Sequence, residues 1–304
     1  ALIAGEATFD AAASLNAVWS GKNIEASKRQ GSFGSDPLGT LARRIQQADV
    51  PARFGHGAHD VDVAQRCGAA AQPTQVAAQH GSAHGPDVGD DPGEHAGRLA
   101  AARALVNFEA VDAEALFVEN FACYDHIVGP SGSCVHHIRE HLTAIPQTAQ
   151  VQHVRANTFE LVDYLHDMLG VRAFPWAEFP HAVGLHVGCS TLRKLNQAST
   201  SEFPLAVPFS KPRTLLASVK GLRFVAPKRP DECCGFGGTF SIVEEPVSAR
   251  MGQDKVQDHV DAGAEVIVST DMSCTMHQKG CAERMGLPVT FMHIAQVLNG
   301  ARLG

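Results

Sequence analysis

Short apolar runs alternate with segments of helical period from about Ala104 to the end of the chain. The runs predict four strands, at Asp125–Gly129, Val183–Val187, Leu222–Val225 and Glu265–Ser269. Alternating strands and helices are typical of an α/β fold with a mostly parallel sheet. Ligands of such sheets bind beyond the carboxyl ends of the strands, so the residues that follow these strands are the first candidates for a site.

Two amphipathic helices are predicted between the strands. One begins near Thr158 and ends at Gly170, with apolar residues at helical spacing: Phe159, Val162, Leu165 and Leu169. The other begins at Pro246 and ends at Gly263, because proline is favoured in a first helical turn and glycine after a last one. Its apolar residues share one broad face: Val247, Met251, Val256 and Val260.

The part of the chain before Ala104 has a different composition. Residues 51–103 hold 13 Ala and 8 Gly, but one Leu, one Phe and no Ile. Such a segment cannot bury enough apolar area to offset the conformational entropy of ordering it. We therefore expect residues 1–103 to be an anomalous, irregular segment.

Charge and hydropathy exclude two classes of partner. The formal net charge of -7 argues against nucleic acid, whose phosphates require a concentrated positive face. No stretch approaches the roughly 18 consecutive apolar residues of a membrane span, and no export signal is recognisable. We expect a cytoplasmic protein, in which thiols stay reduced and clustered cysteines serve metal or redox chemistry.

Four of the eight cysteines follow predicted strands. Cys189 lies just past Val187, Cys233 and Cys234 follow the third strand after a polar loop, and Cys274 follows the fourth strand. Because parallel strands end at one edge of a sheet, these four residues are expected to meet there. Iron in a cluster takes four soft thiolate ligands, and adjacent cysteines suit separate irons of a cluster better than one tetrahedral ion.

Other interpretations of these residues remain open. The cysteines can be ordinary buried residues, as we expect of Cys67, Cys123 and Cys281, or a zinc site, although no Cys-x-x-Cys pair is present. Gly235–Gly238 lets the backbone approach closely and donate N–H groups toward sulfur. This run lacks the Lys-Ser/Thr ending of a phosphate loop.

Several polar residues near the four cysteines are further candidates for the site. His277 is a candidate ligand or hydrogen-bond donor, because it lies three residues after Cys274. His186, Arg193 and Asp271 are close enough in sequence to face a substrate or quinone.

Four stretches of the sequence resemble the cysteine-rich CCG family. The stretches are Tyr124 to Cys134, the strand before Cys189, Asp231 to Ser241 with its Cys-Cys-Gly-Phe-Gly-Gly block, and Asp271 to His277. The chain is most similar to iron–sulfur subunits of the lactate-utilisation protein A type. It is also similar to the cysteine-rich subunit of heterodisulfide reductase and to the iron–sulfur subunit of glycolate oxidase. The resemblance covers about Ala104 to Gly304.

The resemblance implies a protein of two related α/β domains, with residues 104–180 a partial first CCG domain and residues 181–304 the second. The second would bind an iron–sulfur cluster, expected to be 4Fe-4S. Cys189, Cys233, Cys234 and Cys274 would be the cluster ligands of the second domain, with Cys134 the last cysteine of the first. Where the wider family ends in Cys-x-x-Cys, this chain has Cys274 and His277.

The resemblance also implies a function. The subunit would pass electrons during oxidation of L-lactate to pyruvate, with iron–sulfur and flavin or quinone-linked partners, and would reach the inner membrane only through them. The alternatives are a catalytic subunit like heterodisulfide reductase and a zinc-binding interaction module.

The first domain departs from the family, because its opening cysteine strand and its own Cys-Cys-Gly are absent. One explanation is a divergent N-terminal half that has lost its site. The other is that residues 1–103 are read out of frame, since codons for Arg98–Arg103 can encode Thr-Cys-Cys-Gly-Gln when shifted. The gene sequence distinguishes the two explanations.

Overall fold

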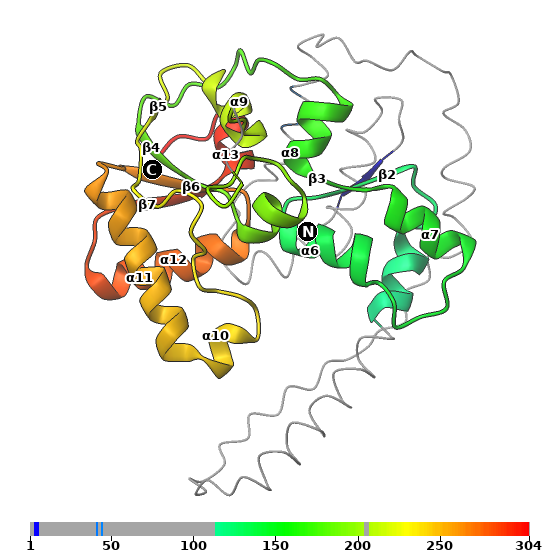
Figure 1. The fold of residues 1–304 in the computed structure, drawn as a ribbon. Coiled ribbons are helices and arrows are strands. Elements are labelled where there is room, and N and C mark those ends of the chain that lie inside the picture. The colour runs from blue at the N-terminus through cyan, green and yellow to red at the C-terminus, as the bar shows by residue number, and fades with distance from the viewer. Residues whose placement is uncertain (1–2, 6–40, 42–43, 45–112, 204–206, 304) are drawn as a thin grey trace, which may run out of the picture.

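The structure is a computed structural model that describes residues 3–5, 41, 44, 113–203 and 207–303. It confirms the predicted α/β class, with two sheets of mainly parallel strands and helices packed around them (Figure 1). The expectations for residues 1–103, that for Cys67 included, lie almost entirely outside the described residues. No described helix is both long and apolar enough to span a membrane.

The first sheet has the strand order β1-β2-β3. Strand β2 (His126–Gly129) pairs antiparallel with β1 (Ile3–Gly5) and parallel with β3 (Thr158–Glu160). The accompanying helical segments are α6 (Gly132–His136), the π-helical turn η1 (His137–His141), α7 (Ala149–Ala156), α8 (Leu161–Asp163) and the π-helical turn η2 (Tyr164–Met168). Ile127 and Val154 are fully buried between the sheet and these helices.

The predicted helix start at Thr158 is wrong. Thr158–Glu160 forms β3, and the helix begins at Leu161. Two physical effects decide this: β3 pairs with β2, and the Glu160 carboxylate accepts the Val162 N–H at 2.7 Å, which caps the new helix. Phe159 matched the helical period by coincidence, because one residue of a short strand can fall at any period.

The second sheet is parallel throughout, with the order β5-β4-β6-β7. Its strands are β4 (Ala182–His186), β5 (Arg223–Phe224), β6 (Val266–Ser269) and β7 (Thr290–His293). Strands β4, β5 and β6 agree within one or two residues with three of the predicted strands. Strand β2 agrees equally well with the remaining prediction, Asp125–Gly129. Strand β7 was not predicted, because its apolar run is broken by polar residues at both ends.

Helices cover both faces of this second sheet (Figure 1). On one face lie α9 (Lys211–Ala217) and α13 (Ile294–Leu298), and on the other lie α11 (Glu245–Asp261) and α12 (Met272–Met285). The short elements are η3 (Ser190–Lys194) and α10 (Phe240–Val243). Strand β6 shows why both faces are covered: Val266 and Val268 pack in the core with α9 and α13, and Ile267 packs with α11 and α12.

The first sheet and the second contain the same local unit. In each, a strand contains an Ile-Val pair followed by one last residue, Gly129 in β2 and Ser269 in β6. A turn follows the strand, and then a helix begins whose third residue is cysteine, Cys134 in α6 and Cys274 in α12. Further along each unit, after α7 in the first and directly after α12 in the second, a strand pairs parallel with the first one. That strand leads into another helix, capped by Glu160 or by His293. This repetition supports two related α/β units.

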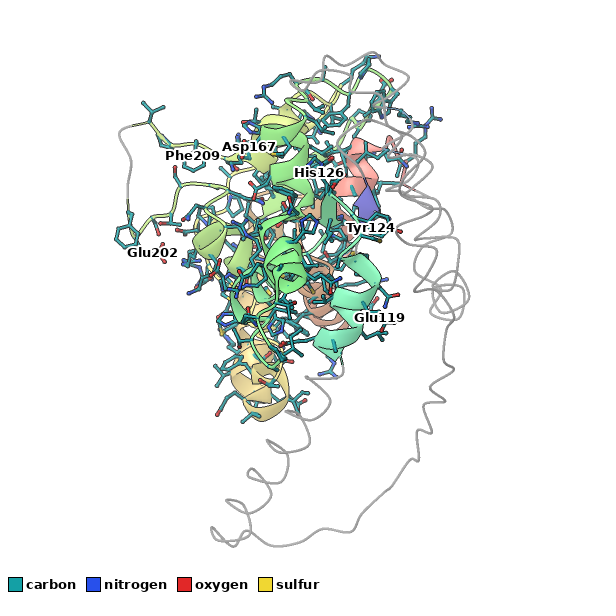
Figure 2. The ribbon with its side chains drawn as sticks, turned by 90° about the vertical axis from the view of Figure 1, so that its right-hand side faces the viewer. Glu119, Tyr124, His126, Asp167, Glu202 and Phe209 are labelled. Atoms are coloured by element: carbon teal, nitrogen blue, oxygen red, sulfur yellow. The ribbon has the colours of Figure 1, made fainter. Side chains whose placement is uncertain are left out.

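One loop departs from the compact packing of the other elements. Figure 2 shows Glu202 and Phe209 on a loop that projects from the body between η3 and α9. The loop is joined at its base by the backbone bridge between Ala198 and Ser210.

Candidate metal centre

Four cysteines meet at the carboxyl edge of the second sheet, as the sequence predicts. Cys189 directly precedes η3 after β4, Cys233 and Cys234 lie in the loop after β5, and Cys274 lies in the first turn of α12 after β6. All four line one cavity of about 310 Å³. Strands β5, β4 and β6 are neighbours, which explains how residues so distant in sequence converge.

The four thiols form a continuous chain of contacts. Cys189 and Cys233, Cys233 and Cys234, and Cys234 and Cys274 each lie close enough to shift one another's pKa. The contact with Cys233, followed by burial, raises the pKa of Cys189. The pKa of Cys234 is lowered by the thiol of Cys233 and raised by that of Cys274. Burial raises it further, and the result is a pKa of about 12.

These raised pKa values mean that the thiols of Cys189 and Cys234 favour their protonated form over the thiolate. Thiolates are the form that binds metal, and neighbouring thiolates repel one another unless a cation lies between them. A metal group at the centre supplies that positive charge and displaces the thiol protons. Four soft donors packed this closely therefore fit an iron–sulfur cluster or another thiophilic metal.

Helix α11 holds the loop that carries Cys233 and Cys234. Ser248 Oγ donates to the carbonyl of Gly235 at 2.8 Å, and Lys255 Nζ donates to the carbonyls of Arg229 and Pro230. The carboxylate of Asp258 accepts the N–H groups of Lys228 and Arg229 at 3.0 and 2.9 Å. The loop is therefore fixed on both sides of Cys233 and Cys234, at residues 228–230 before them and at Gly235 after them.

Gly235 is required by its backbone conformation and by space. Its φ is +90°, a region unfavourable to side chains, and a Cβ there would lie 2.6 Å from the carbonyl oxygen of Ser248. Its N–H donates to Cys233 Sγ at 3.4 Å. This contact confirms the prediction that the glycine-rich segment directs an N–H group toward sulfur.

Asp271 organises the start of α12, where Cys274 lies. Its Oδ1 accepts the Ser273 N–H at 2.9 Å, and its Oδ2 accepts the hydroxyls of Ser131 and Ser133 at 2.7 and 3.0 Å. Asp271 and Ser133 both line the cavity, as the proximity of Asp271 to Cys274 in sequence suggested.

His186 is the buried side chain beside the cysteines. It is fully buried at the end of β4, and one of its ring nitrogens lies within 4.8 Å of the Sγ atoms of Cys234 and Cys274. Burial lowers the pKa of His186, and the charges of Lys255 and His259 add to this effect. Arg193 does not line the cavity, and it donates to Glu202 and to the carbonyl of Asp231.

Two further sequence candidates do not join the four cysteines. Cys134 is exposed in α6 and does not line the cavity. His277 has its Nε2 3.1 Å from the carbonyl oxygen of Ser248 and its ring near Phe236. A role for either as ligand stays a prediction.

The remaining described cysteines lie elsewhere. Cys281 is buried between α11 and α12, as expected of a core residue. Cys123 is half-buried and disulfide-bonded, which differs from the buried free thiol expected there.

Comparisons with known proteins agree with the geometry. Residues 183–279 match the cysteine-rich domain family CCG, and this range contains all four cysteines of the cavity. Lactate utilization protein A of Exiguobacterium sp. is 36% identical over 200 residues, which cover 64% of this chain and 72% of the relative. The protein of the same name from Geobacillus thermodenitrificans is 33% identical over 195 residues, covering 63% and 77%. Lactate utilization protein A 1 of Bacillus mycoides is 33% identical over 190 residues, covering 61% and 73%.

Proposed function

The chain belongs to the lactate utilization protein A family, and from this membership we propose that it is an iron–sulfur subunit that transfers electrons in the oxidation of L-lactate to pyruvate. The convergence of four cysteines on one cavity is the observation that carries the proposal. The ligands proposed for the cluster, of 4Fe-4S type, are Cys189, Cys233, Cys234 and Cys274. When bound, such a cluster supplies one-electron transfer.

The residues around the cysteines suit this task. Ser248 and Lys255 of α11 hold the Cys-Cys-Gly loop rigid, and the Gly235 N–H is directed at Cys233 sulfur. Hydrogen bonds to sulfur and a rigid surround set the potential of a cluster and limit the rearrangement that accompanies electron transfer.

Oxidation of lactate to pyruvate releases two electrons and two protons, so a one-electron carrier needs partners. We propose that the hydride or electron pair is taken by a flavin-containing partner, and that iron–sulfur or quinone-linked partners complete the chain of carriers. The protein would act in the cytoplasm and meet the inner membrane only through them. We further propose residues 104–180 as a partial first CCG domain and residues 181–304 as the cluster-binding one.

Two other functions each have an observation in their favour. Cys233 and Cys234 line the cavity side by side, as a catalytic subunit of the heterodisulfide reductase kind would need to receive a disulfide. The trio of His186, Cys234 and Cys274 has the donor types of a zinc site, as a zinc-binding interaction module would need. Neither observation accounts for all four thiols as well as a cluster does.

Metal and acid-labile sulfide analysis of the full chain, prepared without oxygen, tests the proposal. We expect iron and sulfide in comparable amounts, lost in Cys234→Ser and retained in Cys281→Ser, a matched variant of a buried cysteine outside the cavity. A cluster that survives in Cys234→Ser would remove the central claim. Zinc without sulfide would select the interaction module, and disulfide reduction by the isolated chain would select the catalytic subunit.

A further inference from the structure

His186 carries the least satisfied polar group near the four cysteines. Its side chain is fully buried, and neither ring nitrogen has a hydrogen-bond partner. A buried donor without an acceptor is unfavourable, and native proteins contain few of them. The histidine therefore indicates an acceptor that the thiols alone do not provide.

The surroundings of His186 restrict what that acceptor can be. One ring nitrogen shares a neighbourhood of 4.8 Å with the Sγ atoms of Cys234 and Cys274. Lys255 and His259 of α11 are the other titratable side chains whose charges act on this ring. The Lys255 ammonium cannot accept a hydrogen bond, and no hydrogen bond joins the His186 ring to His259, so the two sulfurs are the acceptors that lie within 4.8 Å of a ring nitrogen.

A neutral thiol is a poor acceptor, whereas a metal-bound thiolate is a good one. The unpartnered N–H is therefore explained if Cys234 and Cys274 carry negative charge in the working protein. Four cysteines already supply a complete ligand set for a four-iron cluster, so the imidazole is not needed as a ligand.

We propose that His186 donates a ring N–H to the thiolate sulfur of Cys234 or Cys274 and so raises the reduction potential of the bound cluster. The inference rests on the proposed function, because the acceptor is a cluster ligand. His186 is then a positioning residue, which stabilises the more negative, reduced state.

The test compares the potential and the nitrogen coupling of four full-length proteins loaded with iron and sulfide. These are the wild type, His186→Leu, which removes the donor, His186→Gln, which keeps an N–H, and His259→Gln as the matched buried histidine. The measurements are metal and sulfide content, the midpoint potential from redox titration, and pulsed electron paramagnetic resonance of protein labelled with 15N-histidine.

We expect His186→Leu to keep its iron and sulfide, to show a lower potential and to lose a weak 15N coupling that the wild type shows. His186→Gln should recover much of the potential, and His259→Gln should change it far less than His186→Leu does. An unchanged potential in His186→Leu would overturn the inference, and so would a strong 15N coupling in the wild type, which indicates direct ligation.

Two outcomes separate this inference from the proposed function. If His186→Leu fails to hold the cluster, the 15N coupling of the wild type decides alone, because it needs no variant. If the wild type itself contains no iron and sulfide, the proposed function is overturned and the inference falls with it. A loaded wild type without 15N coupling overturns only the inference.

Discussion

The hydroxyl of Ser131 donates to the Asp271 carboxylate at 2.7 Å, although 140 positions separate the two residues. Each residue is the N-cap of a helix whose third residue is cysteine, Ser131 for α6 and Asp271 for α12. The bond therefore joins equivalent points of the two α/β units. A second bond connects them nearby, between His293 Nε2 and the carbonyl of Pro130 at 2.9 Å.

Removing this bond should destabilise the fold in proportion to the partners lost. Ser131→Ala removes one donor and should lower the free energy of unfolding by about 1 kcal/mol, whereas Asp271→Ala also removes a helix cap and should cost about 3 kcal/mol. The double variant should be less destabilised than the sum, by about 1 kcal/mol, in denaturant unfolding. Strict additivity would show that the bond does not form.

Gly235 should tolerate no side chain. Gly235→Ala places a Cβ at positive φ and against the Ser248 carbonyl, so we expect a loss of about 3 kcal/mol in unfolding free energy and loss of bound iron. Gly238→Ala is the matched control, because its φ is +63° but no atom lies within 4 Å of the added Cβ. It should cost about 1 kcal/mol. Equal effects of the two variants would contradict the importance of the close approach.

The hydrogen bond from Ser248 should anchor the cysteine loop. Ser248 is buried and its Oγ donates to the Gly235 carbonyl at 2.8 Å, so Ser248→Ala should cost about 1–2 kcal/mol and speed the release of iron to a chelator. Ser241→Ala removes a similar bond, to the Gly238 carbonyl at 2.7 Å, at an exposed position. That variant should stay within about 0.5 kcal/mol of the wild type. Iron release at the same rate from both variants would count against the anchor.

Glu160 should make the fold less stable at alkaline pH. Burial raises its pKa to about 8, against hydrogen bonds from Gln197 and Val162 that favour the carboxylate. Because the folded protein holds this proton more tightly than the unfolded chain, the stabilisation is complete below pH 4.5 and is lost as the pH rises through about 8. The loss is on the order of 5 kcal/mol at most.

Denaturant unfolding at pH 5, 7 and 9 measures this effect. Glu160→Gln keeps the size of the side chain and cannot ionise, so its stability should change much less over that interval. Gln197 contacts this carboxyl group directly, because its Nε2 lies 2.5 Å from Glu160 Oε2. A Glu160→Gln protein that loses as much stability as the wild type on going to pH 9 would place the titrating group elsewhere.

The strands were predictable because their signal is local. Runs such as Glu265–Ser269 are apolar enough to be buried on both faces, and the observed β6 differs from this prediction by one residue. Thr158–Glu160 was mistaken for helix, because a three-residue strand has no period of its own and is defined by its pairing with β2. The helices that carry Cys134 and Cys274 were likewise not predicted: α6 has only five residues and no side-chain cap, although Asp271 is a local capping signal for α12.

The sequence by itself determined the α/β class and the placement of four cysteines after strands, because apolar runs, glycine and proline act over a few residues and parallel strands share an edge. Only the tertiary structure decided which polar groups surround those cysteines. His186 has no hydrogen-bond partner among the described residues, because it is fully buried in the folded protein. Asp271 accepts the hydroxyl of Ser131, because the two units pack together. Burial and pairing of this kind arise between segments far apart in the chain, where no local pattern records them.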